Sequence, residues 1–143
     1  MDYAVARHNM VDNQIRTNRV RDPMVLEALA AVPRELFVPK QMRGIAYVDE
    51  DVDLGNGRYL MEPLVLARLL QLAEVRAEDV TLAIGCGTGY TAAVLARLAS
   101  AVVALESDAD LATRASGLLA EQGADNVAVV TGPLRDGYPT QAP

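Results

Sequence analysis

The stretch VTLAIGCGTGY, residues 80–90, predicts the fold of this 143-residue chain. A short apolar run, residues 80–84, leads into three glycines at alternate positions, and a segment with helical spacing follows over residues 90–99. Glycines in such a turn permit positive φ values and let a ligand approach the backbone where a Cβ would block it. The stretch therefore predicts a strand, a ligand-binding turn and a helix.

The residues after this stretch repeat the alternation of strand and helix. Apolar runs at residues 101–105 and 127–131 predict two more strands. The segment LATRASGLLAEQ between them predicts a helix that Asp108 can cap and that stops at Gly123. Apolar strands joined by helices indicate a parallel sheet covered on both faces. We expect an α/β fold with a Rossmann-like half-sheet, its parallel strands in the order 3-2-1.

The N-terminal region reads as mainly helical. An apolar stripe predicts a helix over residues 3–16. Asp22 and Pro23 are typical of the cap and the first turn of a second helix, and Pro33 is expected to end it. Pro63 can open a third helix through Ala73.

An irregular connection is expected between the second and third of these helices. Residues 38–58 are acidic and contain the turn glycines Gly55 and Gly57, and connections of this length within a domain are usually functional. We therefore expect one domain in two parts: a helical N-terminal region with a substrate-side loop, residues 1–75, and a β-α-β-α-β half, residues 76–143.

The spacing of the glycines discriminates between ligands. A phosphate-binding loop would need Gly-Lys-Ser/Thr, and a dinucleotide fingerprint needs a small residue where Tyr90 stands, so NAD is disfavoured. The spacing G-x-G-x-G opens S-adenosylmethionine (SAM) sites in Rossmann-like methyltransferases, and Glu106 supplies an acceptor for both ribose hydroxyls. The alternative is a tight structural turn with a solvated Glu106. The candidate cofactor-binding residues are Gly85, Cys86, Gly87, Thr88, Gly89, Tyr90 and Glu106.

Composition excludes several other classes of protein. The sequence is 51% hydrophobic and 22% charged with a net charge of -6, which describes a globular protein and not a disordered one. The acidity lies after residue 43, which argues against a large nucleic-acid surface. No export or membrane segment is visible and a single cysteine cannot form a disulfide within one molecule, so we expect the cytoplasm. We expect no metal site, a surface or capping role for His8, and a small loop residue in Cys86.

Four stretches carry a family resemblance that covers essentially the whole sequence. They occur in the order and spacing of the protein-L-isoaspartate O-methyltransferase family: AAVPRELFVP (30–39), AYVDEDVDLGNG (46–57), IGCGTGYTAAVLARLA (84–99) and GADNVAVVTG (123–132). The resemblance implies a SAM-dependent enzyme that methylates the carboxylate of isoaspartyl residues in damaged proteins. Peptides or proteins with such residues are then the expected partners.

The sequence also departs from the family pattern. Where the family usually carries Gln-Thr-Ile-Ser, Arg58 to Met61 stand here, and methionine cannot donate a hydrogen bond. Ala83 stands where the family usually has an acidic residue. Pro133-Leu134 stands where the family usually has Asp-Gly after the third strand, and Asp136 could take the place of that aspartate only if the register were shifted. We take Arg58 and Met61 as candidate catalytic positions, Arg58 as a clamp for a substrate carboxylate or as a solvated arginine. Two alternative functions therefore remain: methyl transfer to a different acceptor, and a SAM-binding or interaction module without catalytic activity.

The resemblance further implies about four more strands, the first of which pairs with the strand at residues 80–84. That strand is therefore expected to be an exposed edge here. We favour a piece of a longer protein over a missing half supplied by a partner subunit, and a homo-oligomer through the exposed edge is a further option.

Overall fold

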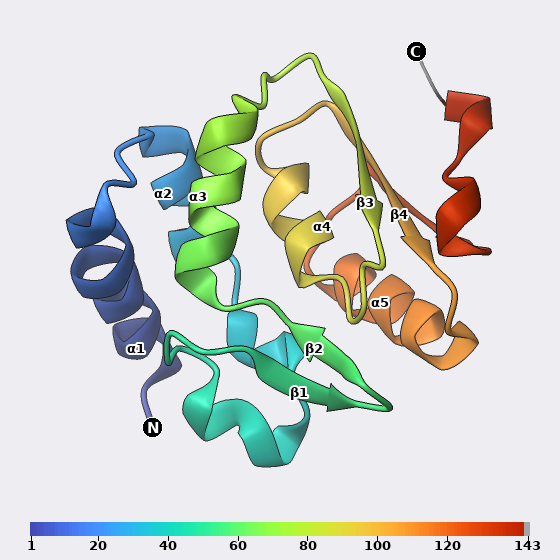
Figure 1. Ribbon diagram of the computed structural model, residues 1–143. Helices are drawn as coiled ribbons and strands as arrows, with labels where there is room; N and C mark the ends of the chain where they lie inside the picture. Colours follow the sequence, from blue (N-terminus) through green and yellow to red (C-terminus); the bar gives the residue numbers. More distant parts are fainter. Residues whose placement is uncertain (142–143) are drawn as a thin grey trace. The chain divides into compact units, whose positions relative to one another are not determined.

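The computed structural model describes residues 1–141, and the protein forms two compact units, Met1–Val75 and Arg76–Pro143 (Figure 1). Whether these units act as one domain stays a prediction. Within the part of the sequence described, none of the helices has the length and apolar character needed to cross a bilayer. The cytoplasmic location likewise stays a prediction.

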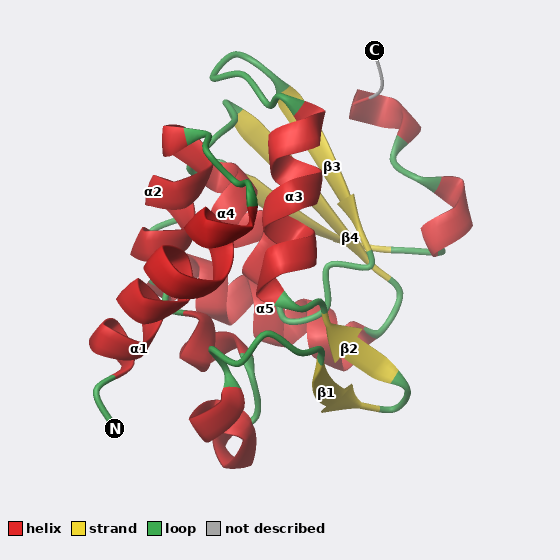
Figure 2. Cartoon of the chain, turned by 60° about the vertical axis from the view of Figure 1, so that its left-hand side comes forward, coloured by secondary structure: helices red, strands yellow, loops and turns green. Residues whose placement is uncertain are grey.

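The second unit is built on a parallel three-stranded sheet with two connecting helices (Figure 2). Its strands pair in the order β3-β4-β5, with Val80 opposite Ala101 and Val102 opposite Val127. The α/β fold and the 3-2-1 strand order are thus confirmed. The elements are β3 (Val80–Ile84), α4 (Tyr90–Ala96), β4 (Ala101–Glu106), α5 (Ala109–Glu121) and β5 (Val127–Thr131).

Local sequence signals set the ends of α5. Asp108 precedes the helix, and its Oδ1 accepts hydrogen bonds from the N–H groups of Asp110 and Leu111 at 2.9 and 3.1 Å. Gly123, with φ of 68°, reverses the backbone just after the helix. The predicted cap and stop are both confirmed, whereas α4 ends at Ala96, three residues earlier than its apolar spacing predicts.

One face of β3 is open, which corrects the expectation that both faces of the sheet are covered. The side chains of Val80, Leu82 and Ile84 are 55%, 42% and 57% exposed, whereas the central strand β4 is buried from Val102 onward. Alternate residues of a strand point to the same face, so these three form one apolar row. Residues of the 3-10 turns Leu134–Asp136 and Pro139–Gln141 line a pocket of about 350 Å³ together with Val80 and Leu82.

The first unit contains three α-helices, and the first of them is shorter than predicted. After Asn9 the backbone continues as a π-helical segment, Met10–Ile15, and a 3-10 turn, so the predicted helical segment over residues 3–16 is confirmed but only its first part is an α-helix. The wider π turn brings the side chains of Met10, Val11 and Ile15 into the core together. The α-helices are α1 (Tyr3–Asn9), α2 (Pro23–Ala31) and α3 (Pro63–Ala73).

The caps of α2 agree with the sequence. The Asp22 Oδ1 accepts the N–H of Met24 at 2.9 Å, and Pro23 occupies the first turn. The helix ends just before Pro33, and α3 begins and ends at the predicted residues.

The connection over residues 38–58 is more ordered than expected. It contains the 3-10 segment Lys40–Ile45 and then strand β1 (Val52–Gly55), which pairs antiparallel with β2 (Arg58–Leu60). Asn56 and Gly57 form the two-residue turn, with φ values of 54° and 73°. Asn-Gly is the preferred pair for such a turn because both residues tolerate positive φ. The expectation of an irregular connection is therefore wrong for the hairpin.

A buried polar network ties the first helix to the segments around residues 35 and 47. The Arg7 Nη2 lies 3.3 Å from Glu35 Oε1, and the Arg7 Nε donates to the Tyr47 hydroxyl at 2.9 Å. The hydroxyl in turn donates to Glu35. Burial, together with the hydrogen bond to the Glu35 carboxylate, raises the pKa of Tyr47 well above its ordinary value of 10.0.

This raised pKa predicts a loss of stability at alkaline pH. Above pH 10 the unfolded protein releases the Tyr47 proton while the folded protein retains it, so the free energy of unfolding falls as the pH rises. Tyr47→Phe should reduce that slope and cost about 1 to 2 kcal/mol at neutral pH through the lost hydrogen bonds. Urea titrations at neutral and alkaline pH measure both effects. Tyr59→Phe, at a side chain 62% exposed, is the control, and an equal slope in both variants would contradict the assignment.

Candidate functional site

The glycine turn follows β3 and is held against the end of β4. Gly85, Gly87 and Gly89 have φ values of 72°, 57° and 100°, which residues with a side chain rarely adopt. The N–H groups of Gly85 and Cys86 both donate to the Leu105 carbonyl, at 2.8 and 3.2 Å. The carboxyl end of β4 is therefore bonded directly to the beginning of the turn.

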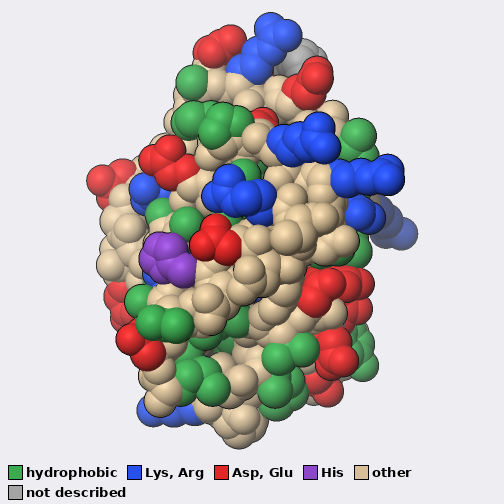
Figure 3. All heavy atoms as spheres, turned by 90° about the vertical axis from the view of Figure 1, so that its left-hand side faces the viewer, with side chains coloured by type: hydrophobic (Ala, Val, Ile, Leu, Met, Phe, Trp, Pro, Cys, Tyr) green, Lys and Arg blue, Asp and Glu red, His purple; other side chains and the backbone are tan. Residues whose placement is uncertain are grey.

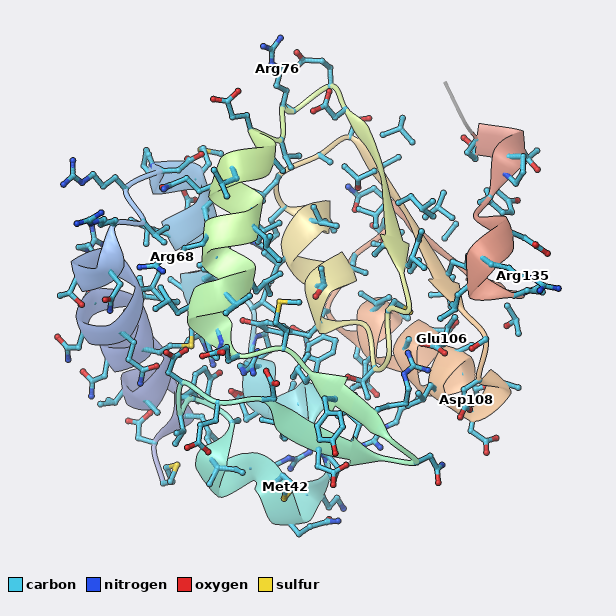
Figure 4. The ribbon with its side chains drawn as sticks, in the orientation of Figure 1. Met42, Arg68, Arg76, Glu106, Asp108 and Arg135 are labelled. Carbon is cyan, nitrogen blue, oxygen red and sulfur yellow. The ribbon has the colours of Figure 1, made fainter. Side chains whose placement is uncertain are left out.

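Glu106 is the last residue of β4, and its carboxylate faces this turn. The Oε1 atom accepts the N–H of Gly87 at 2.8 Å, and the Oε2 atom accepts the N–H of Asp108 at 2.9 Å. Figure 4 shows Glu106 and Asp108 together where β4 leads into α5. The side chain is fully buried, so the alternative of a solvated glutamate is wrong. Hydrogen bonds from two backbone N–H groups stabilise the charge of a buried carboxylate.

The turn and the Glu106 carboxylate are the positions predicted to bind an adenosyl cofactor, and this assignment stays a prediction. A carboxylate oxygen can accept more than one hydrogen bond, so the bonds from the Gly87 and Asp108 N–H groups do not by themselves prevent Glu106 from binding a ligand hydroxyl. The backbone of Gly85 and Gly87 presents no Cβ to a ligand. Since Glu106 is fully buried, a ribose that binds there must displace groups that now cover it.

The other residues of the turn differ in what they contribute. A Cβ on Gly89 would lie 3.3 Å from atoms of both Ala115 and Leu119, so this glycine permits close packing of the turn on α5. The side chains of Thr88 and Tyr90 are buried in the protein interior. The Cys86 thiol is also buried, 3.7 Å from the Gly87 carbonyl oxygen. That these residues contact a cofactor stays a prediction.

Arg58 and Met61 belong to the first unit, on and just after β2. Three side chains from other segments hold the backbone that follows Leu60. The Arg34 Nη2 donates to the Met61 carbonyl at 2.9 Å, and the Asp51 and Asp49 carboxylates accept the N–H groups of Glu62 and Leu64 at 2.8 and 3.1 Å. Met61 itself is 39% exposed. The segment around the two candidate positions therefore has a fixed backbone after Leu60 and an accessible methionine.

Sequence reasoning missed these three supporting residues. Arg34 is fully buried and also donates to the Ala46 carbonyl at 2.5 Å, so its guanidinium links two segments of the first unit. Asp49 and Asp51 cap α3 from more than ten positions upstream, where no local capping pattern would reveal them.

Other sequence candidates lie away from the turn. Asp136 lines the pocket beside Val80 and Leu82, near the beginning of β3 and not at its carboxyl end. His8 is exposed, with its Nδ1 2.8 Å from the Ala4 carbonyl oxygen, so a surface position is confirmed.

The described residues hold no group of three or more potential metal ligands. On the face in Figure 3, acidic and basic side chains are interspersed with apolar ones.

The fold and the turn define a class of protein. A parallel β-α-β-α-β unit with a glycine turn after its first strand and a carboxylate after its second is that of the Rossmann-like methyltransferases. A solved protein-L-isoaspartate O-methyltransferase superposes with a TM-score of 0.83 at 25% identity, over 96% of this chain and 45% of that one. A second solved structure, from Plasmodium falciparum, shares the fold with a TM-score of 0.72 at 17% identity, over 92% of this chain and 63% of that one.

The sequence comparisons define the family. The family model described as Protein-L-isoaspartate(D-aspartate) O-methyltransferase (PCMT) matches residues 5–143, and the chain belongs to this family. Curated relatives named protein-L-isoaspartate O-methyltransferase are 42% identical in Methanoculleus marisnigri and 44% identical in Methanoregula boonei, each over 96% of this chain. The chain spans 62% and 63% of the length of these two relatives.

Proposed function

We propose that the protein binds SAM at the glycine turn and transfers its methyl group to the free carboxylate of isoaspartyl residues in peptides and proteins. The observation that carries the proposal is the Glu106 carboxylate, held toward the turn by the N–H groups of Gly87 and Asp108. Membership of the PCMT family supports it, as does the solved Plasmodium falciparum structure, which is a complex with S-adenosyl-L-homocysteine.

The proposed reaction asks little of the side chains. SAM supplies an electrophilic methyl group when bound, and a carboxylate acceptor is already ionised at neutral pH, so no strong general base is required. The protein then acts by orienting the acceptor and excluding water, and orientation alone can contribute about 7 to 11 kcal/mol. Glu106 holds the ribose, and the backbone of Gly85 and Gly87 lies against the cofactor.

Acceptor binding is assigned to Arg58. Met61 stands where the family usually has serine and has no hydroxyl to donate, so it can contribute only apolar contact. A guanidinium can bind both oxygens of a carboxylate, and Arg58 stands three residues before Met61 at the beginning of β2. The loss of the serine hydroxyl favours the second candidate function, a SAM-binding module without transferase activity.

Methyl transfer to a matched pair of peptides tests the proposal. Labelled SAM and the protein are incubated with one peptide containing isoaspartate and one of the same sequence containing aspartate. Label is expected only in the isoaspartyl peptide, and calorimetry should detect S-adenosylhomocysteine binding. Arg58→Ala should raise the peptide KM at least about tenfold, as expected for a lost charge-assisted bond, with Arg114→Ala on α5 as control. Cofactor binding without transfer would favour the non-catalytic module, and no binding would overturn the cofactor assignment.

A further inference from the structure

The tip of the β1–β2 hairpin carries a bond of unusual chemical lability. Of the five asparagines in the sequence, Asn56 is the one that precedes a glycine. The others precede larger residues: Asn9 before Met, Asn13 before Gln, Asn18 before Arg and Asn126 before Val. A glycine offers no side chain to hinder its own amide nitrogen, so that nitrogen can approach the carbonyl carbon of the preceding asparagine side chain.

The structure exposes this bond and leaves room around it. Gly55, Asn56 and Gly57 are all exposed, and a Cβ built on either glycine would meet nothing within 4 Å. The tip is therefore open to water and free of crowding by other segments. Asn126 differs, because its side-chain amide donates to the carbonyls of Ala96 and Ala99 at 3.0 and 3.2 Å.

The turn joins two short strands. Three residue pairs join β1 to β2, and the register shifts between Asp53 and Gly55. The hairpin is anchored at its base by the buried side chains of Val52 and Leu60, and exposed loop tips are where proteins change most easily. An open tip can leave the left-handed conformation of Asn56, φ of 54°, and reach the geometry that ring closure requires.

We propose that Asn56 is a modification site: it deamidates to isoaspartate, and another copy of this protein methylates the product. The Gly57 nitrogen bonds to the carbonyl carbon of the Asn56 side chain, the bond from that carbon to the amide nitrogen breaks, and ammonia leaves with the Gly57 amide proton. Water then opens the cyclic imide at the backbone carbonyl of residue 56. The backbone now runs through the former side chain, and the original backbone carboxylate is free.

The change alters the hairpin and the charge of its tip. One extra carbon enters the backbone of a two-residue turn, which cannot then hold the pairing of Gly55 with Arg58. Arg58 then loses its pairing with Gly55, which sets the position from which it is proposed to bind the acceptor carboxylate. The free carboxylate at the tip belongs to the substrate class of the proposed function, on which this second half of the inference rests.

Ageing the purified protein tests the modification itself. The protein is held at mildly alkaline pH without SAM, digested and mapped by mass spectrometry with fragmentation that distinguishes isoaspartate from aspartate. Asn56 should convert at least about tenfold faster than the hydrogen-bonded Asn126. The map also separates it from Asp136-Gly137, which can isomerise without a change in mass. Conversion of Asn126 at the same rate as Asn56 would overturn the site.

Methyl transfer from fresh to aged protein tests the second half. Fresh protein and labelled SAM should place label on the peptide containing residue 56 of the aged protein. Asn56→Gly keeps a turn that tolerates positive φ and removes the amide, so its aged form should accept no label there. If fresh protein labels an unrelated isoaspartyl peptide but not aged protein, methylation at residue 56 is refuted. If fresh protein labels neither the isoaspartyl peptide nor the aged protein, the proposed function is refuted, and so is methylation at residue 56. Deamidation of Asn56 is tested separately by the peptide map.

Discussion

Glu106→Gln is expected to weaken S-adenosylhomocysteine binding at least about tenfold and to lower the free energy of unfolding by about 1 to 3 kcal/mol. The carboxylate accepts from Gly87 and Asp108 with both of its oxygens. Glutamine has the same shape, but its amide nitrogen must face one of these N–H groups, which leaves two donors in contact inside the protein. Calorimetry measures the first effect and urea denaturation the second.

Glu121→Gln provides the matched control for this experiment. It removes the same charge from an exposed position at the end of α5. Its affinity and stability should stay close to those of the unaltered protein. If both variants bind S-adenosylhomocysteine as tightly as the unaltered protein, Glu106 is a structural residue and the proposed cofactor site is wrong.

Gly89→Ala is expected to destabilise the protein by about 2 to 4 kcal/mol. Alanine at a φ of 100° is strained, which costs roughly 1 to 2 kcal/mol in the left-handed region. Its Cβ would also lie 3.3 Å from Ala115 and Leu119, and overpacking of a core costs about 1 to 3 kcal/mol. Thermal or urea denaturation measures the loss, which should be present without any ligand.

Gly117→Ala is the companion variant and should change stability in the opposite direction. Gly117 lies within α5, and a Cβ there would meet nothing within 4 Å. Alanine is preferred over glycine inside a helix by about 0.5 to 1 kcal/mol. If Gly89→Ala keeps its stability but loses S-adenosylhomocysteine binding, Gly89 serves the ligand and not the packing of the turn on α5.

The second unit could be predicted closely because its signals are local. The runs at β3, β4 and β5 are apolar throughout, and the residues that bound α5, Asp108 and Gly123, stand next to it in the sequence. Glu106 follows a buried strand directly, so its place near the glycine turn follows from the parallel arrangement. Its hydrogen bond to Asp108 could not be predicted, because it depends on the path of the backbone after β4.

The first unit was harder to predict because contacts distant in sequence shape it. Arg34 binds carbonyls twelve and twenty-seven residues away, and nothing near it in the sequence distinguishes it from a surface arginine. The hairpin did carry a local signal, Asn56-Gly57, but strands of four and three residues are too short to show a clear alternation. The sequence predicted that β3 is an edge strand, but not that the side chains on one of its faces are exposed.

The open row of Val80, Leu82 and Ile84 has a consequence for the life of this protein in a cell. Chaperones bind exposed apolar segments, and an exposed apolar edge strand promotes aggregation with other chains. Overproduction should therefore divert part of the material into inclusion bodies, and replacement of Leu82 by a polar residue should reduce that fraction.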